Sequence, residues 1–279
     1  MITKRIFFLL FILLSARITY SQDALHTQYN KAAALYEAGE YFDAITEFKR
    51  LLFFDSGKKY YYLANEYIGD SYKMGGKFSD AIIYYTYSEI AAVTDSEVFN
   101  ARVNCIRANI LRRTTTRALA MLDTLSADNR FKKKIQIINY WKGWAYIFSN
   151  EWEKAAAAFA ETDSNSELVS LCKKVDDEKY SVTLANTLSH FIPGAGQFYT
   201  GNYWSGLLSL GWNVLWGYLS VKAFVDNRIF DGIVISNFLW FRFYRGNFEN
   251  ASKFAEEKNT VITNKALNYL QFNYAGLKP

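Results

Sequence analysis

A pattern that recurs every 37 residues limits the fold of this chain more than any other feature of its sequence. Its most regular position is an alanine, found at Ala44, Ala81, Ala118 and Ala155. Small residues stand twelve positions before three of these alanines, and a bulky apolar residue follows each alanine by four positions. A unit of this length cannot bury its apolar face alone, so four successive copies predict a stack of similar units.

The residue types in each copy predict a pair of antiparallel helices. Small residues let two helices approach closely, and aromatic rings fill the space beside them. The positions twelve residues before the alanines are Ala32, Gly69, Ile106 and Gly143. The positions four residues after them are Phe48, Tyr85, Leu122 and Phe159. The third copy is the most degenerate, because it keeps only Ala118 and Leu122 of the pattern.

These registers resemble those of the tetratricopeptide repeat (TPR) family, whose consensus has a small residue, an aromatic, a turn glycine, an alanine and a second aromatic at these offsets. The resemblance covers residues 25–163. The period exceeds the family's usual length of about 34 residues, and the closing proline is missing from every copy. The resemblance implies an all-α superhelix of four helical hairpins. A further helix over residues 166–179 would cap the stack.

The resemblance also implies a binding groove, because the first helix of each repeat usually lines the concave face in that family. The positions carried over are Tyr29, Ala33, Tyr36, Glu66, Asp70, Lys73, Asn100, Val103, Arg107, Tyr140, Trp144 and Ile147. Aromatic side chains mixed with charges of both signs suit an extended peptide or a partner helix. The alternative is that Tyr29, Tyr140 and Trp144 pack between neighbouring repeats.

The first 21 residues have the layout of a secretory signal peptide. Lys4 and Arg5 precede an apolar run over residues 6–14, and Thr19 and Ser21 place small residues before a cleavage site. Cleavage after Ser21 would leave the mature chain outside the cytoplasm. The alternative is an uncleaved N-terminal anchor.

The charge distribution changes abruptly after residue 180. No Lys, Arg, Asp or Glu occurs in the 41 residues from Ser181 to Val221, and within them Tyr203–Val221 is long enough to cross the hydrocarbon core of a bilayer. A second candidate span, Phe230–Phe248, is weaker because it holds three charged residues, two of them arginines that could snorkel to a headgroup region. Together they predict a transmembrane helical hairpin. A soluble buried helix is the alternative.

A glycine-rich motif opens the first candidate span. Its residues are Pro193, Gly194, Gly196, Gln197, Tyr199, Gly201 and Gly206. It resembles the Pro-Gly-x-Gly-Gln-x-Tyr-x-Gly-x-Tyr motif of small two-helix membrane domains in bacterial envelope proteins. The pairs Gly246-Asn247 and Asn250-Ala251 are similar to the closing segment of those domains. The resemblance covers residues 184–259 and implies a membrane-embedded hairpin.

The predicted fold class is therefore all-α, a TPR-like helical-hairpin superhelix followed by a transmembrane helical hairpin. The predicted segments are a signal peptide over 1–21, a repeat domain over 22–180, a membrane hairpin over 181–250, and an amphipathic C-terminal helix and tail over 251–279.

Composition excludes several classes of function. The net charge of +5 is not gathered in one basic domain, which argues against nucleic acid as the main partner. Cys105 and Cys172 are too few for a disulfide framework and are either paired or, more simply, buried thiols. The sequence has two histidines and shows no zinc spacing and no nucleophile elbow, so we predict no cofactor, metal site or catalytic residue.

We therefore expect a non-enzymatic scaffold of the bacterial cell envelope, anchored in the inner membrane with its repeats in the periplasm. A protein or peptide would bind in the groove, lipid would surround the hairpin, and oligomers are possible. Confinement at the membrane would raise the effective concentration of the partner. Two alternatives stay open: a membrane-embedded lipid-handling enzyme that uses His190, Gln197 and Tyr199, and a transport component whose hairpins oligomerise through Gly206 and Asn213.

Overall fold

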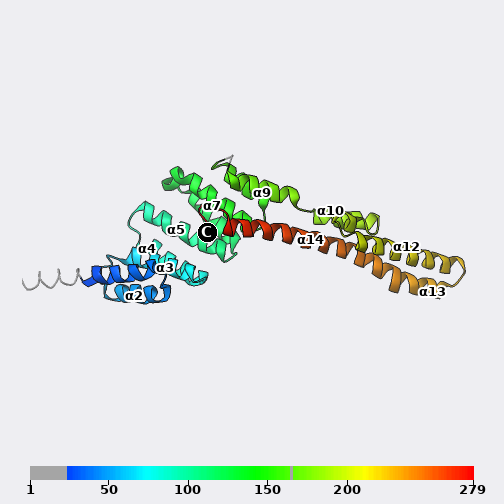
Figure 1. Cartoon of the computed structure of the whole chain (residues 1–279), viewed down its shortest axis with the longest axis horizontal. Coiled ribbons are helices and arrows are strands. Elements are labelled where there is room, and N and C mark those ends of the chain that lie inside the picture. The colour runs from blue at the N-terminus through cyan, green and yellow to red at the C-terminus, as the bar shows by residue number, and fades with distance from the viewer. Residues whose placement is uncertain (1–23, 164–165) are drawn as a thin grey trace, which may run out of the picture. The chain divides into compact units, whose positions relative to one another are not determined.

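The computed structural model describes residues 24–163 and 166–279 (Figure 1). Within these ranges every regular element is helical and no strand occurs, which confirms the all-α class. The predicted signal peptide over residues 1–21 lies outside the described residues.

The described chain divides into two compact units. The first, called the repeat unit here, extends to Val169 and also includes Leu277–Pro279. The second, called the hairpin unit, comprises Ser170–Gly276. The division falls inside α9 (Glu167–Glu178), the helix that the sequence places as a cap on the repeats. The last three residues, expected in a C-terminal tail, belong by their contacts to the repeat unit.

The repeat unit consists of four helical hairpins. Its elements are a helix over residues 24–37, α2 (Tyr41–Phe54), α3 (Tyr61–Met74), α4 (Phe78–Ala91), α5 (Asp95–Leu111), α6 (Thr115–Ala127), the 3₁₀ helix η1 (Asn129–Lys134), α7 (Ile135–Phe148) and α8 (Trp152–Ala160). The second helices of the four pairs begin at residues 41, 78, 115 and 152, so the 37-residue period of the sequence reappears in the helix boundaries. Helices that follow one another in sequence pack together.

Each hairpin has the same turn between its two helices. The turn residues are Gly39, Gly76, Arg113 and Asn150, with φ values of 80°, 72°, 62° and 65°. The next residue donates its backbone N–H to a carbonyl five positions earlier, as in the bonds from Glu40 to Leu35 (2.9 Å) and from Thr114 to Asn109 (3.0 Å). This bond closes the end of the first helix in a Schellman-type arrangement. The third copy, degenerate in sequence, therefore keeps the turn geometry of the others.

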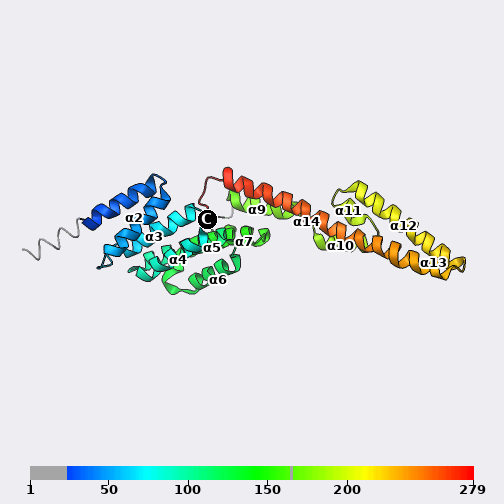
Figure 2. The ribbon, with the colours of Figure 1, turned by 90° about the horizontal axis from the view of Figure 1, so that it is seen from below.

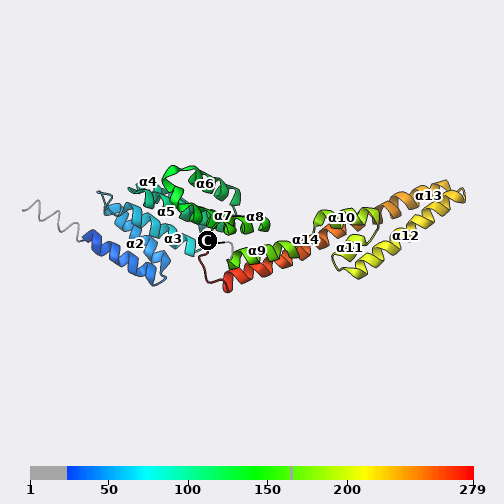
Figure 3. The ribbon, with the colours of Figure 1, turned by 90° about the horizontal axis from the view of Figure 1, so that it is seen from above.

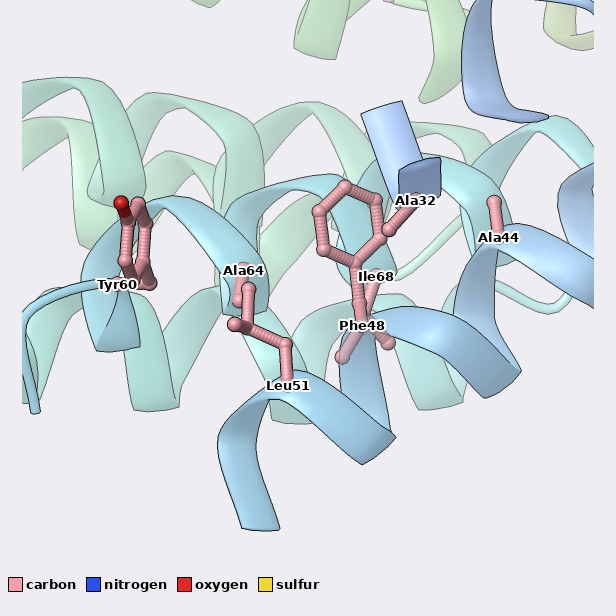
Figure 4. Close-up of a cluster of buried hydrophobic side chains, with 7 residues drawn as sticks. All are labelled: Ala32, Ala44, Phe48, Leu51, Tyr60, Ala64 and Ile68. Carbon is pink, nitrogen blue, oxygen red and sulfur yellow. The ribbon is translucent and has the colours of Figure 1, made fainter. Parts of the chain in front are cut away.

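In the core of each hairpin, a residue of the first helix is matched with a residue sixteen positions later. The second residue is bulkier than the first or of the same size. A Cβ atom on Gly69 would lie 2.6 Å from the ring of Tyr85, and one on Gly143 would lie 2.6 Å from the ring of Phe159. Figure 4 shows the Phe48 ring beside Ala32 in the first copy.

The third copy fills the same space in another way. Its pair is Ile106 and Leu122, and both side chains are fully buried. A larger first residue is thus accompanied by a smaller second one, although the Ile–Leu pair as a whole is bulkier than the pairs of the other copies.

The hairpin unit contains α9 from Ser170 onward and six further elements. They are α10 (Val182–Phe191), α11 (Ala195–Tyr199), α12 (Tyr203–Val225), α13 (Ile229–Val234), the π-helical segment η2 (Ile235–Trp240) and α14 (Phe241–Phe272). After a turn at Asn227, whose φ is 61°, the chain returns along α12, and α12 contacts α13, η2 and α14 (Figures 2 and 3).

Two features of this unit differ from the expected segments. The second candidate span and the amphipathic C-terminal helix were expected to meet at residue 250, but α14 runs through this position without a break. No proline occurs there, so nothing in the backbone ends the helix. Among the described helices, none is both long enough and apolar enough to cross a membrane. The transmembrane hairpin therefore stays a prediction.

Candidate functional site

The groove positions on the first helix lie in an aromatic cluster at the start of the repeat unit. Tyr29 stacks on Tyr60 with 5.1 Å between ring centroids, and it meets Tyr67 edge-on at 6.2 Å. Tyr36 meets Tyr67 edge-on at 5.0 Å, and Ala33 packs against the same core. Burial raises the pKa of Tyr29 and of Tyr36 to about 12. Tyr29 thus packs against the second repeat and offers little surface to a ligand.

A row of polar side chains begins on α3. Asp70 accepts a hydrogen bond from the Tyr85 hydroxyl at 2.6 Å, and the ammonium of Lys73 lies 3.7 Å from the same carboxylate oxygen. Burial, assisted by the positive charge of Arg107, lowers the pKa of Lys73. Burial raises the pKa of Glu66, which lies one helical turn before Asp70. Three predicted groove residues of α3 therefore share one partly buried polar surface.

This row continues from α3 onto α5. The Asn104 amide donates to the Glu66 carboxylate at 3.1 Å, and Arg107 donates from Nη1 to Asn104 Oδ1 at 3.2 Å. Asn104 was not among the predicted groove residues. Its position three residues before Arg107 places it on the same helix face, so the spacing was a signal that could have found it. We call Glu66, Asp70, Lys73, Asn104 and Arg107 the polar row.

The row ends at Arg107, whose guanidinium lies over the Trp141 ring of α7 with 5.0 Å to the centroid. From Nη2, Arg107 donates to the backbone carbonyl of Lys278 at 3.0 Å. The Tyr140 hydroxyl donates to the carbonyl of Leu277. Arg107 and Tyr140, predicted to line the groove, thus hold two successive carbonyl groups of one short segment.

The remaining predicted positions differ in accessibility. Asn100 is exposed, and Val103 and Ile147 are buried. Trp144 is 2% exposed and meets Phe159 edge-on at 6.3 Å. These three buried or nearly buried positions contribute to the interior of the repeat unit, whereas Asn100 faces solvent.

In the hairpin unit, two residues of the motif, Gly194 and Gln197, bond to one buried residue, Asn247 of α14. Its Oδ1 accepts from the backbone N–H of Gly194 at 2.8 Å, and its backbone carbonyl accepts from the Gln197 amide at 2.8 Å. Ser209 of α12 donates to the same Oδ1 at 2.8 Å. Asn247 Nδ2 in turn donates to the carbonyl of Ser189 at 2.6 Å. Asn247 therefore ties α10, α11 and α12 to α14.

The glycines of the motif permit this close packing. Gly194 has a φ of 94°, and a Cβ on it would overlap the carbonyl oxygen of Gly206. A Cβ on Gly196 would overlap the carbonyl oxygen of Ala185, while its N–H donates to Ser189 Oγ at 3.0 Å. Gly201 has a φ of 75° in the turn before α12.

Tyr199, the other polar residue of the motif, also makes structural contacts. The Tyr199 hydroxyl accepts from the backbone N–H of Ser181 at 3.0 Å, and the ring packs edge-on against Tyr180. Pro193 precedes the left-handed Gly194 and is half-buried. The motif thus builds a structural junction.

The three residues of the enzymatic alternative do not share accessible surface. His190 is exposed and stacks on Phe248 with 4.1 Å between ring centroids. Gln197 is fully buried in the Asn247 network. A substrate that reaches the His190 imidazole therefore does not reach the Gln197 amide.

The positions named for oligomerisation are covered within the unit. Asn213 is 4% exposed and donates to the carbonyl of Ser209 at 2.8 Å. A Cβ on Gly206 would lie 3.0 Å from the Phe198 ring. Neither position is available to a second hairpin without rearrangement.

Both cysteines are buried and unpaired, and burial raises the pKa of Cys105 to about 11 and of Cys172 to about 12. Thiols of this kind are poor nucleophiles. Among the residues that the structure describes, no group of three His, Cys, Asp or Glu side chains could hold a metal ion.

Comparison of this chain with protein-family models, with curated proteins and with solved structures gives no match.

Proposed function

We propose that the repeat unit is a TPR-like solenoid that binds an extended segment of a partner protein along the polar row, and that the hairpin unit attaches it to a membrane. The observation that carries the proposal is the pair of bonds from Arg107 and Tyr140 to the carbonyls of Lys278 and Leu277. Donors that satisfy main-chain carbonyls are what a groove for extended peptides requires.

The polar row supports this assignment because it is charged, partly buried and continuous over two repeats. Asn104 joins Glu66 to Arg107, and Lys73 is paired with Asp70, so each side chain is held in place before a ligand arrives. A groove that is pre-organised in this way loses little side-chain entropy when it binds. The arrangement serves recognition; the described contacts contain no nucleophile with an adjacent base, and we propose a non-enzymatic role.

The membrane part of the proposal is supported by the outer surface of the hairpin unit. Large apolar side chains are exposed along α12, α13 and η2, among them Trp204, Leu208, Val214, Tyr218, Phe230 and Phe238. Contiguous exposed apolar surface of this kind marks contact with a membrane or another protein. The polar residues of α12, such as Ser209 and Asn213, bond inside the unit, so they lower the apolarity of the helix without facing outward.

Basic side chains lie beside this apolar surface. Arg242 and Arg245 of α14 line a shallow concavity together with Asn237 and Glu249. Guanidinium groups there suit the phosphates of lipid headgroups. We propose the bacterial inner membrane, with the repeat unit on the periplasmic side, because the N-terminal sequence has the layout of a signal peptide.

The groove is tested by site-specific photocrosslinking in cells that express the full chain. A crosslinker at Asp70 is expected to capture a discrete partner protein, and a crosslinker at Phe53, which is 82% exposed on α2, serves as the control position. Capture from position 70 should be lost in the Arg107→Gln background and retained with Arg112→Gln, which changes the residue that caps the same helix. Capture that is indifferent to Arg107 would refute the groove.

The membrane attachment is tested by alkaline carbonate extraction of vesicles. The full chain should stay in the pellet, and the double substitution Leu208→Glu with Val214→Glu should release it. The same extraction of a Phe53→Glu variant controls for added charge on an exposed apolar position in the repeat unit. Release of the unaltered chain would exclude an embedded hairpin.

A further inference from the structure

The segment Leu277–Pro279 lies against the repeat unit, although it follows the hairpin unit in sequence. It is neither helix nor strand. Lys278 precedes a proline, which disfavours the α conformation at that position and keeps the segment extended. In an extended segment the carbonyl groups are not used by a helix, so they are available to donors outside it.

The path of the chain into this segment depends on Gly276. A Cβ at this position would overlap the Tyr274 hydroxyl. A side chain at this position would therefore require the Tyr274 ring to move. Tyr274 is itself fixed to the end of α14 by a bond from its backbone N–H to the carbonyl of Tyr269 at 3.2 Å.

Two donors from different helices receive the segment. Arg107 comes from α5 and Tyr140 from α7, and they bind successive carbonyls. Both donors are positioned by other contacts, since Arg107 lies over Trp141 and Tyr140 packs edge-on against Phe159 at 5.6 Å. Both of these hydrogen bonds are made to the main chain of the segment.

One donor atom of Arg107 is not used by the segment. Its Nε is buried and has no acceptor among the described residues. A buried N–H without an acceptor is costly, so a ligand with an additional acceptor at this point would bind more tightly than the segment does.

We infer that Arg107 and Tyr140 form a main-chain clamp for an extended peptide, and that Leu277–Pro279 is its resident occupant. A partner segment must displace these three residues before it can occupy the clamp. The inference rests on the proposed groove function and names its ligand class, an extended segment with two successive free carbonyls. Because the resident segment is attached to the same chain, its effective concentration is high and a few contacts hold it. A partner with a longer contact along the polar row can still replace it.

The probe is a fluorescently labelled peptide with the sequence of residues 273–279, and binding is measured by anisotropy on purified full-length protein in detergent. A variant that ends at Gly276 should bind this peptide about tenfold more tightly than the full chain, because a clamp that is occupied nine-tenths of the time weakens apparent affinity by that factor. Equal affinities, or no binding to either protein, would overturn the inference.

Substitutions in the shortened chain test the clamp itself. Tyr140→Phe removes only the hydroxyl and should weaken peptide binding about fivefold or more, whereas Tyr146→Phe on the same helix should have no effect. Arg107→Gln should weaken binding further, with Arg112→Gln as its control. Circular dichroism melting of each variant separates loss of the clamp from loss of folding. Affinity unchanged by Tyr140→Phe in a folded protein would refute the clamp.

The outcomes separate the two proposals. If crosslinks from position 70 capture a partner but removal of residues 277–279 does not change peptide affinity, the groove function stands and self-occupancy is wrong. If the peptide binds the shortened chain through the clamp but no Arg107-dependent partner is captured, the clamp stands and the partner-binding function is wrong.

Discussion

The repeat unit and the hairpin unit bury their interiors by different physical means. In the repeat unit the core is mainly apolar, and each hairpin is closed by a turn and a side-chain pair that lie within one 37-residue copy. In the hairpin unit the central contact is a network of buried polar groups around Asn247, which joins segments more than 50 residues apart. Apolar packing is non-directional and tolerates exchange of residues if volume is kept, whereas hydrogen bonds between buried groups fail when one partner changes.

The third repeat illustrates this tolerance. It has lost the glycine of its turn and the small residue of its core, yet Arg113 takes the left-handed conformation, and Ile106 and Leu122 are both fully buried. We expect that no substitution of Asn247 would leave the hairpin unit equally stable. Four experiments would break or sharpen this contrast, in order of decreasing effect.

The largest effect is expected from Asn247→Leu. It removes the side-chain partner of the buried Gly194 N–H, the Ser209 hydroxyl and the Ser189 carbonyl, at a cost of about 4 kcal/mol in the free energy of unfolding of the hairpin unit. Hydrogen–deuterium exchange in α10 and α11 should rise steeply while exchange in α3–α8 stays constant.

A matched control is Asn237→Leu, because Asn237 is exposed and donates only to the carbonyl of Ile233 in the described contacts. Its effect should stay within about 0.5 kcal/mol. If Asn247→Leu leaves exchange in α10 and α11 unchanged, the polar network is not what closes this unit.

A smaller effect is expected from Gly143→Ala in the repeat unit. The added Cβ meets the Phe159 ring, and the clash should destabilise the unit by about 2 kcal/mol. Combining it with Phe159→Leu should cost less than the sum of the two single changes, because the third copy already pairs a larger residue with leucine. Denaturant unfolding of the four proteins gives the coupling free energy. Strict additivity would show that the pair is not a packing unit.

A substitution at Arg113 is expected to increase stability. Its φ of 62° costs a side chain about 1 kcal/mol, so Arg113→Gly should stabilise the repeat unit by up to that amount. The neighbouring Arg112 has a φ of −71°, and Arg112→Gly should instead be neutral or destabilising. Thermal melting compares the two variants, and a destabilised Arg113→Gly would mean that the side chain matters more than the turn.

The smallest effect concerns the charge of the polar row. Burial raises the pKa of Glu66, so the folded chain binds this proton more tightly than the unfolded chain. Stability should therefore fall as pH rises from about 4.3, the unfolded value, through the raised folded value. Glu66→Gln should remove this part of the decline, whereas Glu40→Gln, at an exposed position, should not. An unchanged pH profile would show that Glu66 is effectively solvated.

Sequence reasoning was most successful where contacts are local. The four alanines of the repeat are all fully buried, and the second helices begin with the predicted spacing. It was less complete at the groove, where it missed Asn104 and Trp141, although both lie on helices that carry predicted groove residues. The spacing of residues predicts which of them share one face of a helix. It does not predict which side chains meet across the groove.

The sequence alone determined the period and the all-α class, because each depends on residues within one copy. Only the tertiary structure decided that Asn247 joins three other helices and that Arg107 meets the carbonyl of Lys278, 171 positions away. Contacts over such separations depend on the path of the whole chain, since no local pattern records which distant group will satisfy a buried donor.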